Sequence, residues 1–100
     1  AVLEWLRKHY TLTENPGMGS DGLYYYYQTM AKALAAAGLR ELELVDGRKI
    51  DWRTDLAKRL LDLQQGEGYW VNDSGRWWEK DPVLVTAYTV LALNAIYQAL

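Results

Sequence analysis

Few side chains in this sequence can do acid–base or metal chemistry. His9 is the single histidine and there is no cysteine, which excludes disulfides, thiolate nucleophiles and every metal site that needs a cysteine or two histidines. His9 can serve as a general base, but its position on an amphipathic segment favours packing at a surface or a helix end. Asp73, Glu79 and Asp81 can bind a cation, although turn formation and helix capping explain Asp73 and Asp81 better. We therefore expect no catalytic residue and no metal site.

Aromatic side chains offer binding chemistry instead. The chain has 8 Tyr, 5 Trp and no Phe, so every Tyr and Trp ring carries a polar group that needs a partner when buried. Tyr24 and Tyr27, from one run of tyrosines, and Tyr88 are candidates to line a cavity for an apolar ligand. The alternative, which we favour, is packing between helices with the hydroxyl groups hydrogen-bonded. Trp77 and Trp78 can stack on a sugar or a base, or cover a helix end.

Composition narrows the classes of partner. With 11 Lys and Arg against 13 Asp and Glu, the net charge is −2, which leaves no basic surface for nucleic acid. One hundred residues, half of them apolar, fit a single globular domain. No signal peptide is visible, so the cellular location stays open. The chain opens at Ala1 inside an expected helix with no capping residue before it, which suggests an excised or engineered segment.

Four helices must position these side chains. Asp81 and Pro82 give the clearest start, as N-cap and first helical residue. Asp51 caps the preceding helix, Ser20 or Asp21 caps the second, and Gly38 ends the second in a left-handed conformation. The expected helices are 2–10, 22–37, 52–65 and 82–100. Residues 42–50 alternate around an Asp-Gly pair, which predicts a short hairpin.

The helices are of two kinds. The first and third have a charged face, and in the third the spacing predicts ion pairs between Asp55 and Arg59 and between Lys58 and Asp62. Residues 83–100 carry no charge, and residues 23–37 carry only one, a lysine. Helices that are apolar nearly all round must be covered nearly all round, so the expected order is outer, inner, outer, inner. Polar residues within 83–100 and the lack of a flanking basic cluster favour burial over a membrane span.

The two halves of the chain are similar. Residues 27–31 (Tyr-Gln-Thr-Met-Ala) match residues 88–92 (Tyr-Thr-Val-Leu-Ala), and the order of elements is the same in both halves. This predicts a single domain, 1–100, built from two helical-hairpin repeats at about 1–47 and 48–100.

One motif links the chain to a known family. The third helix leads into Gln65, and two residues later come Gly68, one intervening residue and Trp70. This pattern resembles the QW repeat of squalene–hopene cyclases and related terpene cyclases. Together with the stretches 22–27, 46–53 and 76–88, it makes nearly the whole chain similar to prenyltransferase/squalene oxidase repeat proteins. The resemblance implies an all-α fold in which two α-hairpin repeats form part of an α/α toroid, with an inner ring of helices wrapped by an outer ring.

The resemblance also implies a structural role for the motif. Gly68 permits the tight turn, the Gln65 amide binds backbone groups at neighbouring helix ends, and the Trp70 ring lies over that amide. The first repeat departs from the pattern, because Tyr10 stands in place of the glutamine and Gly17-Met18-Gly19 in place of Gly-x-Trp.

The catalytic groups of the family are missing from the sequence. It has neither of the aspartate clusters of the terpene cyclases and no cysteine for the zinc site of prenyltransferases. We therefore expect a non-catalytic structural module without a cofactor. A toroid has six inner and six outer helices, so three copies of this chain would close one as a homotrimer; a fragment of a longer toroid is the alternative. A different function, also open, is a binding module or enzyme fragment that accepts an isoprenoid-like apolar ligand beside Tyr24, Tyr27 and Tyr88.

Overall fold

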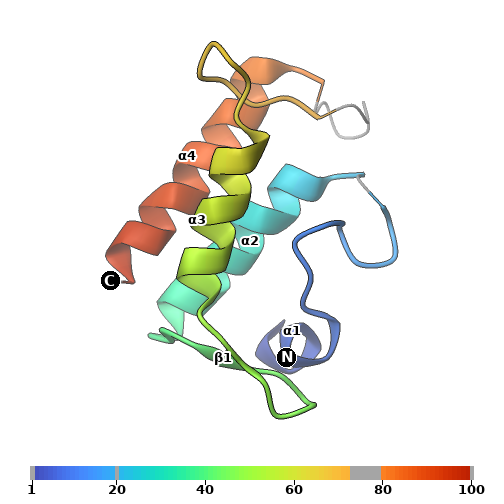
Figure 1. Cartoon of the computed structure of the whole chain (residues 1–100), viewed down its shortest axis with the longest axis vertical. Helices are drawn as coiled ribbons and strands as arrows, with labels where there is room; N and C mark the ends of the chain where they lie inside the picture. The colour runs from blue at the N-terminus through green and yellow to red at the C-terminus, as the bar shows by residue number, and fades with distance from the viewer. Residues whose placement is uncertain (1, 20, 73–79, 100) are drawn as a thin grey trace.

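The computed structural model of the chain describes residues 2–19, 21–72 and 80–99. Within these ranges it is mostly helical, with one small antiparallel sheet in which Leu42 pairs with Ile50 (Figure 1). The sheet is an addition to the expected all-α class. The elements are α1 (Val2–His9), α2 (Leu23–Ala36), β1 (Leu42–Glu43), β2 (Lys49–Ile50), α3 (Trp52–Leu63) and α4 (Pro82–Gln98).

The starts of α3 and α4 follow the capping signals. A carboxylate oxygen of Asp81 accepts a hydrogen bond from the Val83 N–H at 3.0 Å, and Pro82 is the first residue of α4. The Asp51 carboxylate accepts from the Thr54 hydroxyl at 2.9 Å and also caps the Thr54 N–H. Both predicted starts are confirmed, while α3 ends at Leu63, slightly before the expected end.

The start of α2 was predicted wrongly and its end correctly. The N-cap position belongs to Gly22, at φ 65° and without a side-chain cap, and not to Ser20 or Asp21. A left-handed φ at this position favours glycine, which has no Cβ to clash. At the other end Gly38 is left-handed at φ 72°, and its N–H donates to the Ala35 carbonyl at 3.0 Å. The Leu39 N–H donates to the Leu34 carbonyl at 3.2 Å, which completes a Schellman motif.

The helices pack mainly through one pair. The most extensive helix contact is between α2 and α4, while α1 packs on α2 and α3 on α4. Figure 1 shows α3 beside α4 and, in this view, in front of α2, with α1 below them. The core lies between these elements. Its fully buried side chains include Met30, Leu34, Trp52, Leu56, Leu60, Val85 and Ala92.

The predicted hairpin is confirmed and joins the two halves. Its turn places Gly47 at φ 90°, so the expected boundary between the repeats lies at the hairpin tip. The Val45 N–H donates to the Arg7 carbonyl at 3.1 Å, and the Arg7 Nε donates to the Glu43 carbonyl at 2.7 Å. The Trp52 indole, fully buried, donates to the Leu39 carbonyl at 2.8 Å. The hairpin is thereby fixed to the end of α1, and the chain just before it to the start of α3.

Among the described residues, no helix combines the length and the apolar character that crossing a membrane requires.

Candidate functional site

Two tyrosines of α2 hold the segment that follows α1. The Tyr26 hydroxyl donates to the Thr11 carbonyl at 2.9 Å, and the Tyr27 hydroxyl donates to the Leu12 carbonyl. Both rings are buried, and a buried hydroxyl needs such a partner. Tyr27 therefore packs between helix and loop with its hydroxyl bonded.

Burial keeps these phenols neutral. It raises the pKa of Tyr26 to about 12 and also raises the pKa of Tyr27, where hydrogen bonding to Arg59 and the charge of that guanidinium act in the opposite direction. The pKa of Tyr10 is raised by burial and further by the Asp55 carboxylate, which accepts a hydrogen bond from the Tyr10 hydroxyl at 3.2 Å. At neutral pH all three act as hydrogen-bond donors and none as a base.

Arg59 reaches from α3 to the same place. Its Nε lies 3.1 Å from the Leu12 carbonyl oxygen and 3.3 Å from the Tyr27 hydroxyl oxygen. The predicted ion pair between Asp55 and Arg59 is wrong, because Asp55 accepts from Tyr10 and the guanidinium turns toward the loop. An exposed i,i+4 pair stabilises a helix by only a few tenths of a kcal/mol, roughly, so the hydrogen bond to the part-buried Leu12 carbonyl prevails.

The other predicted pair on α3 is also absent. Within the described ranges, Lys58 and Asp62 are not at ion-pairing distance. Both side chains are exposed, where such a pair gains little over hydration.

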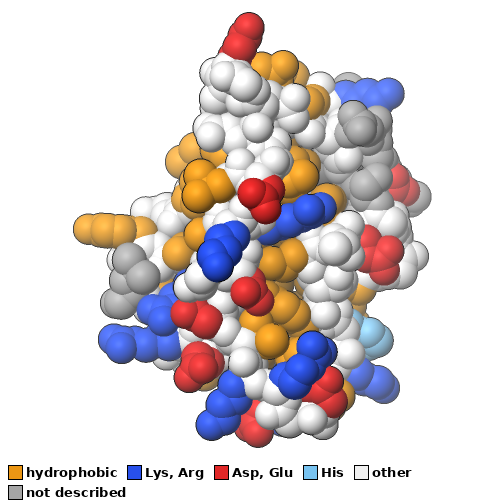
Figure 2. All heavy atoms as spheres, in the orientation of Figure 1, with side chains coloured by type: hydrophobic (Ala, Val, Ile, Leu, Met, Phe, Trp, Pro, Cys, Tyr) orange, Lys and Arg blue, Asp and Glu red, His pale blue; other side chains and the backbone are white. Residues whose placement is uncertain are grey.

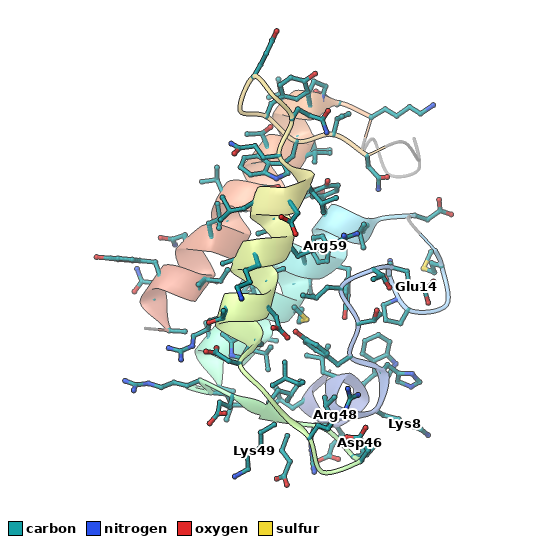
Figure 3. The ribbon with its side chains drawn as sticks, in the orientation of Figure 1. Lys8, Glu14, Asp46, Arg48, Lys49 and Arg59 are labelled. Carbon is teal, nitrogen blue, oxygen red and sulfur yellow. The ribbon has the colours of Figure 1, made fainter. Side chains whose placement is uncertain are left out.

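A pocket of about 320 Å³ opens beside Arg59. It lies between the start of α2, the end of α3 and the segment that follows, and Figure 3 shows Arg59 between α3 and the beginning of α2. The lining residues are Thr13, Leu23, Tyr24, Arg59, Leu63, Gln65, Val71 and Asn72.

Of the three tyrosines that are candidates to line a ligand cavity, one lines this pocket. Tyr24 lines the pocket beside Arg59. Tyr27 meets Tyr24 edge-on, with ring centroids 5.7 Å apart, and is itself buried. Tyr88 is not among the lining residues; its ring contacts that of Tyr25, 5.6 Å away between centroids. The pocket thus brings Tyr24 together with Gln65 and Arg59 and not with Tyr88. The helical spacing placed Arg59 on a charged face and did not indicate that it lines a pocket.

The QW segment forms a tight turn that ends at a buried indole. Gly68 has φ 90°, and its N–H donates to the Gln65 carbonyl at 2.8 Å. The Trp70 indole donates to the Leu60 carbonyl at 2.8 Å, and the Trp70 N–H donates to the Thr86 hydroxyl oxygen at 3.2 Å. Trp70 therefore ties the end of α3 to α4.

The glutamine of the motif acts only locally. The Gln65 side-chain amide is exposed and donates to the carbonyl of Leu63, the last residue of α3, at 3.3 Å. The adjacent Gln64 donates across the turn to the Gly68 carbonyl at 3.2 Å. In this chain the indole and Thr86 make the connection between helices, and the sequence offered no sign of Thr86.

The remaining candidates for chemistry have packing or capping contacts, or lie outside the described residues. The His9 ring, at the end of α1, packs against Trp5 with centroids 4.9 Å apart, and Asp81 caps α4. Among the described residues, no group of three or more His, Asp or Glu stands where it could hold a metal ion. The stretch 73–79, with Asp73, Trp77, Trp78 and Glu79, is not described.

No known family model matches the chain, and neither a curated protein nor a solved structure is significantly similar to it.

One face of α4 is exposed and apolar. Val83, Val90, Leu91 and Tyr97 are 78%, 54%, 52% and 70% exposed. They project from one arc of the helix, opposite the buried side chains of the same helix. Figure 2 shows apolar side chains over α4, whereas charged ones gather over α3 and the hairpin. We call this surface the free face of α4; it consists of Val83, Ala87, Val90, Leu91, Asn94, Tyr97 and Gln98.

Proposed function

We propose that the chain is a non-catalytic structural repeat module whose copies associate through the free face of α4. The observation that carries this proposal is the exposure of four large apolar side chains on one uncharged helix face. Single exposed apolar residues are ordinary, but a contiguous patch is typical of an interaction surface. Left open to water, it would promote aggregation.

The repeat supports a second copy of this chain as the occupant. Residues 27–31 correspond to 88–92, so Met30 of α2 matches Leu91 of α4. Met30 is 2% exposed and Leu91 is 52% exposed, while the following alanines, Ala31 and Ala92, are both fully buried. At this one position the first repeat is covered and the second is open. Repeat units bury such faces against the next unit.

The contact that follows joins unlike surfaces. In this arrangement the free face of α4 in one copy packs against the exposed side of α2 in the next copy. Thr29, Lys32 and Ala36 form an exposed stripe there. Such head-to-tail contacts give a ring when the rotation closes. The resemblance of residues 65–70 to the QW repeat of prenyltransferase/squalene oxidase repeat proteins supports an α/α toroid closed by three copies. We therefore propose that the assembly is an α/α toroid made of three chains.

The polar groups at the helix ends support a structural role. The side-chain donors of Tyr10, Tyr26 and Trp70 each make a hydrogen bond that fixes a loop or a helix end. Structural staples of this kind are what a module needs when its assembly is the function.

The mass in solution tests the proposal. Size-exclusion chromatography with light scattering, over about a hundredfold range of protein concentration, should give a species of three chains. Leu91→Lys on the free face and Ala36→Lys on the opposite stripe should each shift the mass toward one chain, because an interface core excludes an unpaired charge. Leu61→Lys is the matched control, since Leu61 is 65% exposed on α3 and lies outside both surfaces.

Two results would overturn the proposal. A monomer at every concentration removes self-association altogether. A trimer that persists in both Leu91→Lys and Ala36→Lys removes these surfaces from the interface.

A further inference from the structure

The pocket beside Arg59 is separate from the surfaces proposed for assembly. None of its lining residues belongs to the free face of α4 or to the exposed stripe of α2. Any role that it has must therefore be read from its own groups.

Arg59 gives the pocket a positive charge, and only one of its three guanidinium nitrogens is hydrogen-bonded to a residue that the structure describes. Its Nε bonds the Leu12 carbonyl and the Tyr27 hydroxyl. The two terminal amino groups make no hydrogen bond or ion pair with any residue that the structure describes. The guanidinium is half-buried, so a charge beside it is screened less than at an exposed site.

The Nε bonds also hold the guanidinium in place. A fork already fixed at one nitrogen loses little conformational freedom when its terminal nitrogens bind a ligand. Planar N–H groups side by side match the two oxygens of a carboxylate or of a phosphate.

The other walls favour a ligand with a polar and an apolar part. Thr13 and Gln65 supply hydroxyl and amide groups to the lining. Leu23, Leu63 and the Tyr24 ring supply an apolar side. A volume of about 320 Å³ is at the lower end of the range for small-molecule sites, which limits the ligand to about the size of one substituted ring.

We propose that this pocket binds a small organic oxyanion, a carboxylate or phosphate on a compact apolar body, with the terminal amino groups of Arg59 holding the anionic oxygens. Arg59 thus has two functions. Its Nε fixes the loop after α1, and its outer edge receives the anion. The proposal does not depend on assembly.

Nuclear magnetic resonance titration of the full chain tests the proposal directly. The probes are benzoate and phenyl phosphate, with benzyl alcohol as the neutral control of similar shape. Saturable shifts should appear at the backbone amides of Leu63, Gln65 and Val71 and at the Arg59 Nε–H. Benzyl alcohol should give none of them. Benzoate alone, phenyl phosphate alone or both would support the oxyanion site and identify the preferred anion.

Variants separate the site from nonspecific charge. Arg59→Gln should weaken anion binding by at least about tenfold, the usual effect of losing a charged hydrogen bond. Lys58→Gln removes the neighbouring exposed charge and should leave binding unchanged. Thr13→Asp keeps Arg59 and places a negative charge on the wall, so it should also weaken binding. This variant decides the matter if Arg59→Gln does not fold.

The proposal fails on any of three results. The first is no saturable shift with either anion at concentrations of tens of millimolar. The second is equal binding of benzyl alcohol. The third is undiminished anion binding in Thr13→Asp or in a folded Arg59→Gln.

Discussion

The indole of Trp70 completes the end of α3 by donating to the carbonyl of Leu60, 2.8 Å away. The last turn of a helix leaves its carbonyls without partners. Here the Gln64 N–H, which would have continued the pattern, donates to the Leu61 carbonyl at 3.3 Å. Leu60 is fully buried, so no water reaches its carbonyl easily. The indole takes the place of the missing backbone donor.

Replacing the indole should therefore cost stability. We expect Trp70→Phe to lower the free energy of unfolding by about 1–3 kcal/mol, the cost of leaving a buried acceptor unpaired. Urea denaturation followed by circular dichroism measures this. Trp5→Phe is the control, because Trp5 is 42% exposed and its loss should stay within about 0.5 kcal/mol. Equal losses in the two variants would contradict the assignment.

The link from Trp70 to α4 can be tested through Thr86. Its hydroxyl oxygen accepts from the Trp70 N–H at 3.2 Å. Thr86→Val keeps the shape and removes the acceptor, so we expect a loss of about 1 kcal/mol and faster hydrogen exchange at the Trp70 amide. Thr29→Val, at an exposed site of α2, should change neither quantity. An unchanged Trp70 exchange rate in Thr86→Val would show that the bond contributes nothing.

Arg59 and Tyr27 share one acceptor, so their effects should not add. Tyr27→Phe leaves the Leu12 carbonyl with the Arg59 bond, and Arg59→Met leaves it with the Tyr27 bond. We expect each single variant to cost about 1 kcal/mol and the double variant to cost more than the sum, because only then is the carbonyl unpaired. A double-mutant cycle from urea unfolding measures the difference. Strict additivity would mean that the two donors act independently.

Stability should fall at alkaline pH through the buried tyrosines. Burial raises the folded-state pKa of Tyr26 to about 12 from its ordinary value of 10.0. The unfolded chain thus loses the phenol proton first, so the contribution of Tyr26 is fully present below about pH 10 and is lost as the pH rises toward 12. The unfolding free energy of Tyr26→Phe should fall less steeply in this window. Tyr97→Phe, 70% exposed, should follow the parent chain, and a parallel decline in all three would exclude Tyr26 as a cause.

Two glycines offer a test of backbone conformation alone. An added Cβ would meet nothing within 4 Å at Gly38 or at Gly66, but only Gly38 has a positive φ, of 72°. We expect Gly38→Ala to cost about 1–2 kcal/mol, the penalty of a left-handed residue with a Cβ. Gly66→Ala should be neutral or slightly stabilising. Thermal unfolding of the two variants gives the comparison, and a similar change in both would show that φ is not the reason.

Local signals in the sequence predicted local structure well. Asp51 and Asp81 act on N–H groups two or three residues away, so their capping role can be read from the sequence alone. The same holds for Gly38 and for the hairpin around Gly47, where a single φ decides the turn.

Contacts between distant segments could not be predicted in the same way. Helical spacing assigned Arg59 to Asp55, its neighbour four residues before, but its partner is the Leu12 carbonyl, 47 residues away in the chain. A backbone carbonyl carries no residue-specific signal, so no sequence pattern marks it as an acceptor. For the same reason the hydrogen bond from Trp70 to the Leu60 carbonyl could not be predicted. The sequence therefore did not show that Trp70, and not Gln65, connects α3 to α4. The pocket beside Arg59 depends on these long-range contacts and was therefore not foreseen.

The hairpin between the two halves of the chain has a mechanical consequence. It is bonded to α1 through both Glu43 and Val45, and Trp52 fixes Leu39 just before it. Rotation of one half of the chain against the other must break the strand pairing of Leu42 with Ile50 and the hydrogen bond from Trp52 to Leu39. The hairpin thus acts as a rigid connection and not as a hinge. The angle between the two halves is therefore fixed within each molecule. In the proposed assembly, the angle between neighbouring copies would therefore be set by each chain before the copies associate.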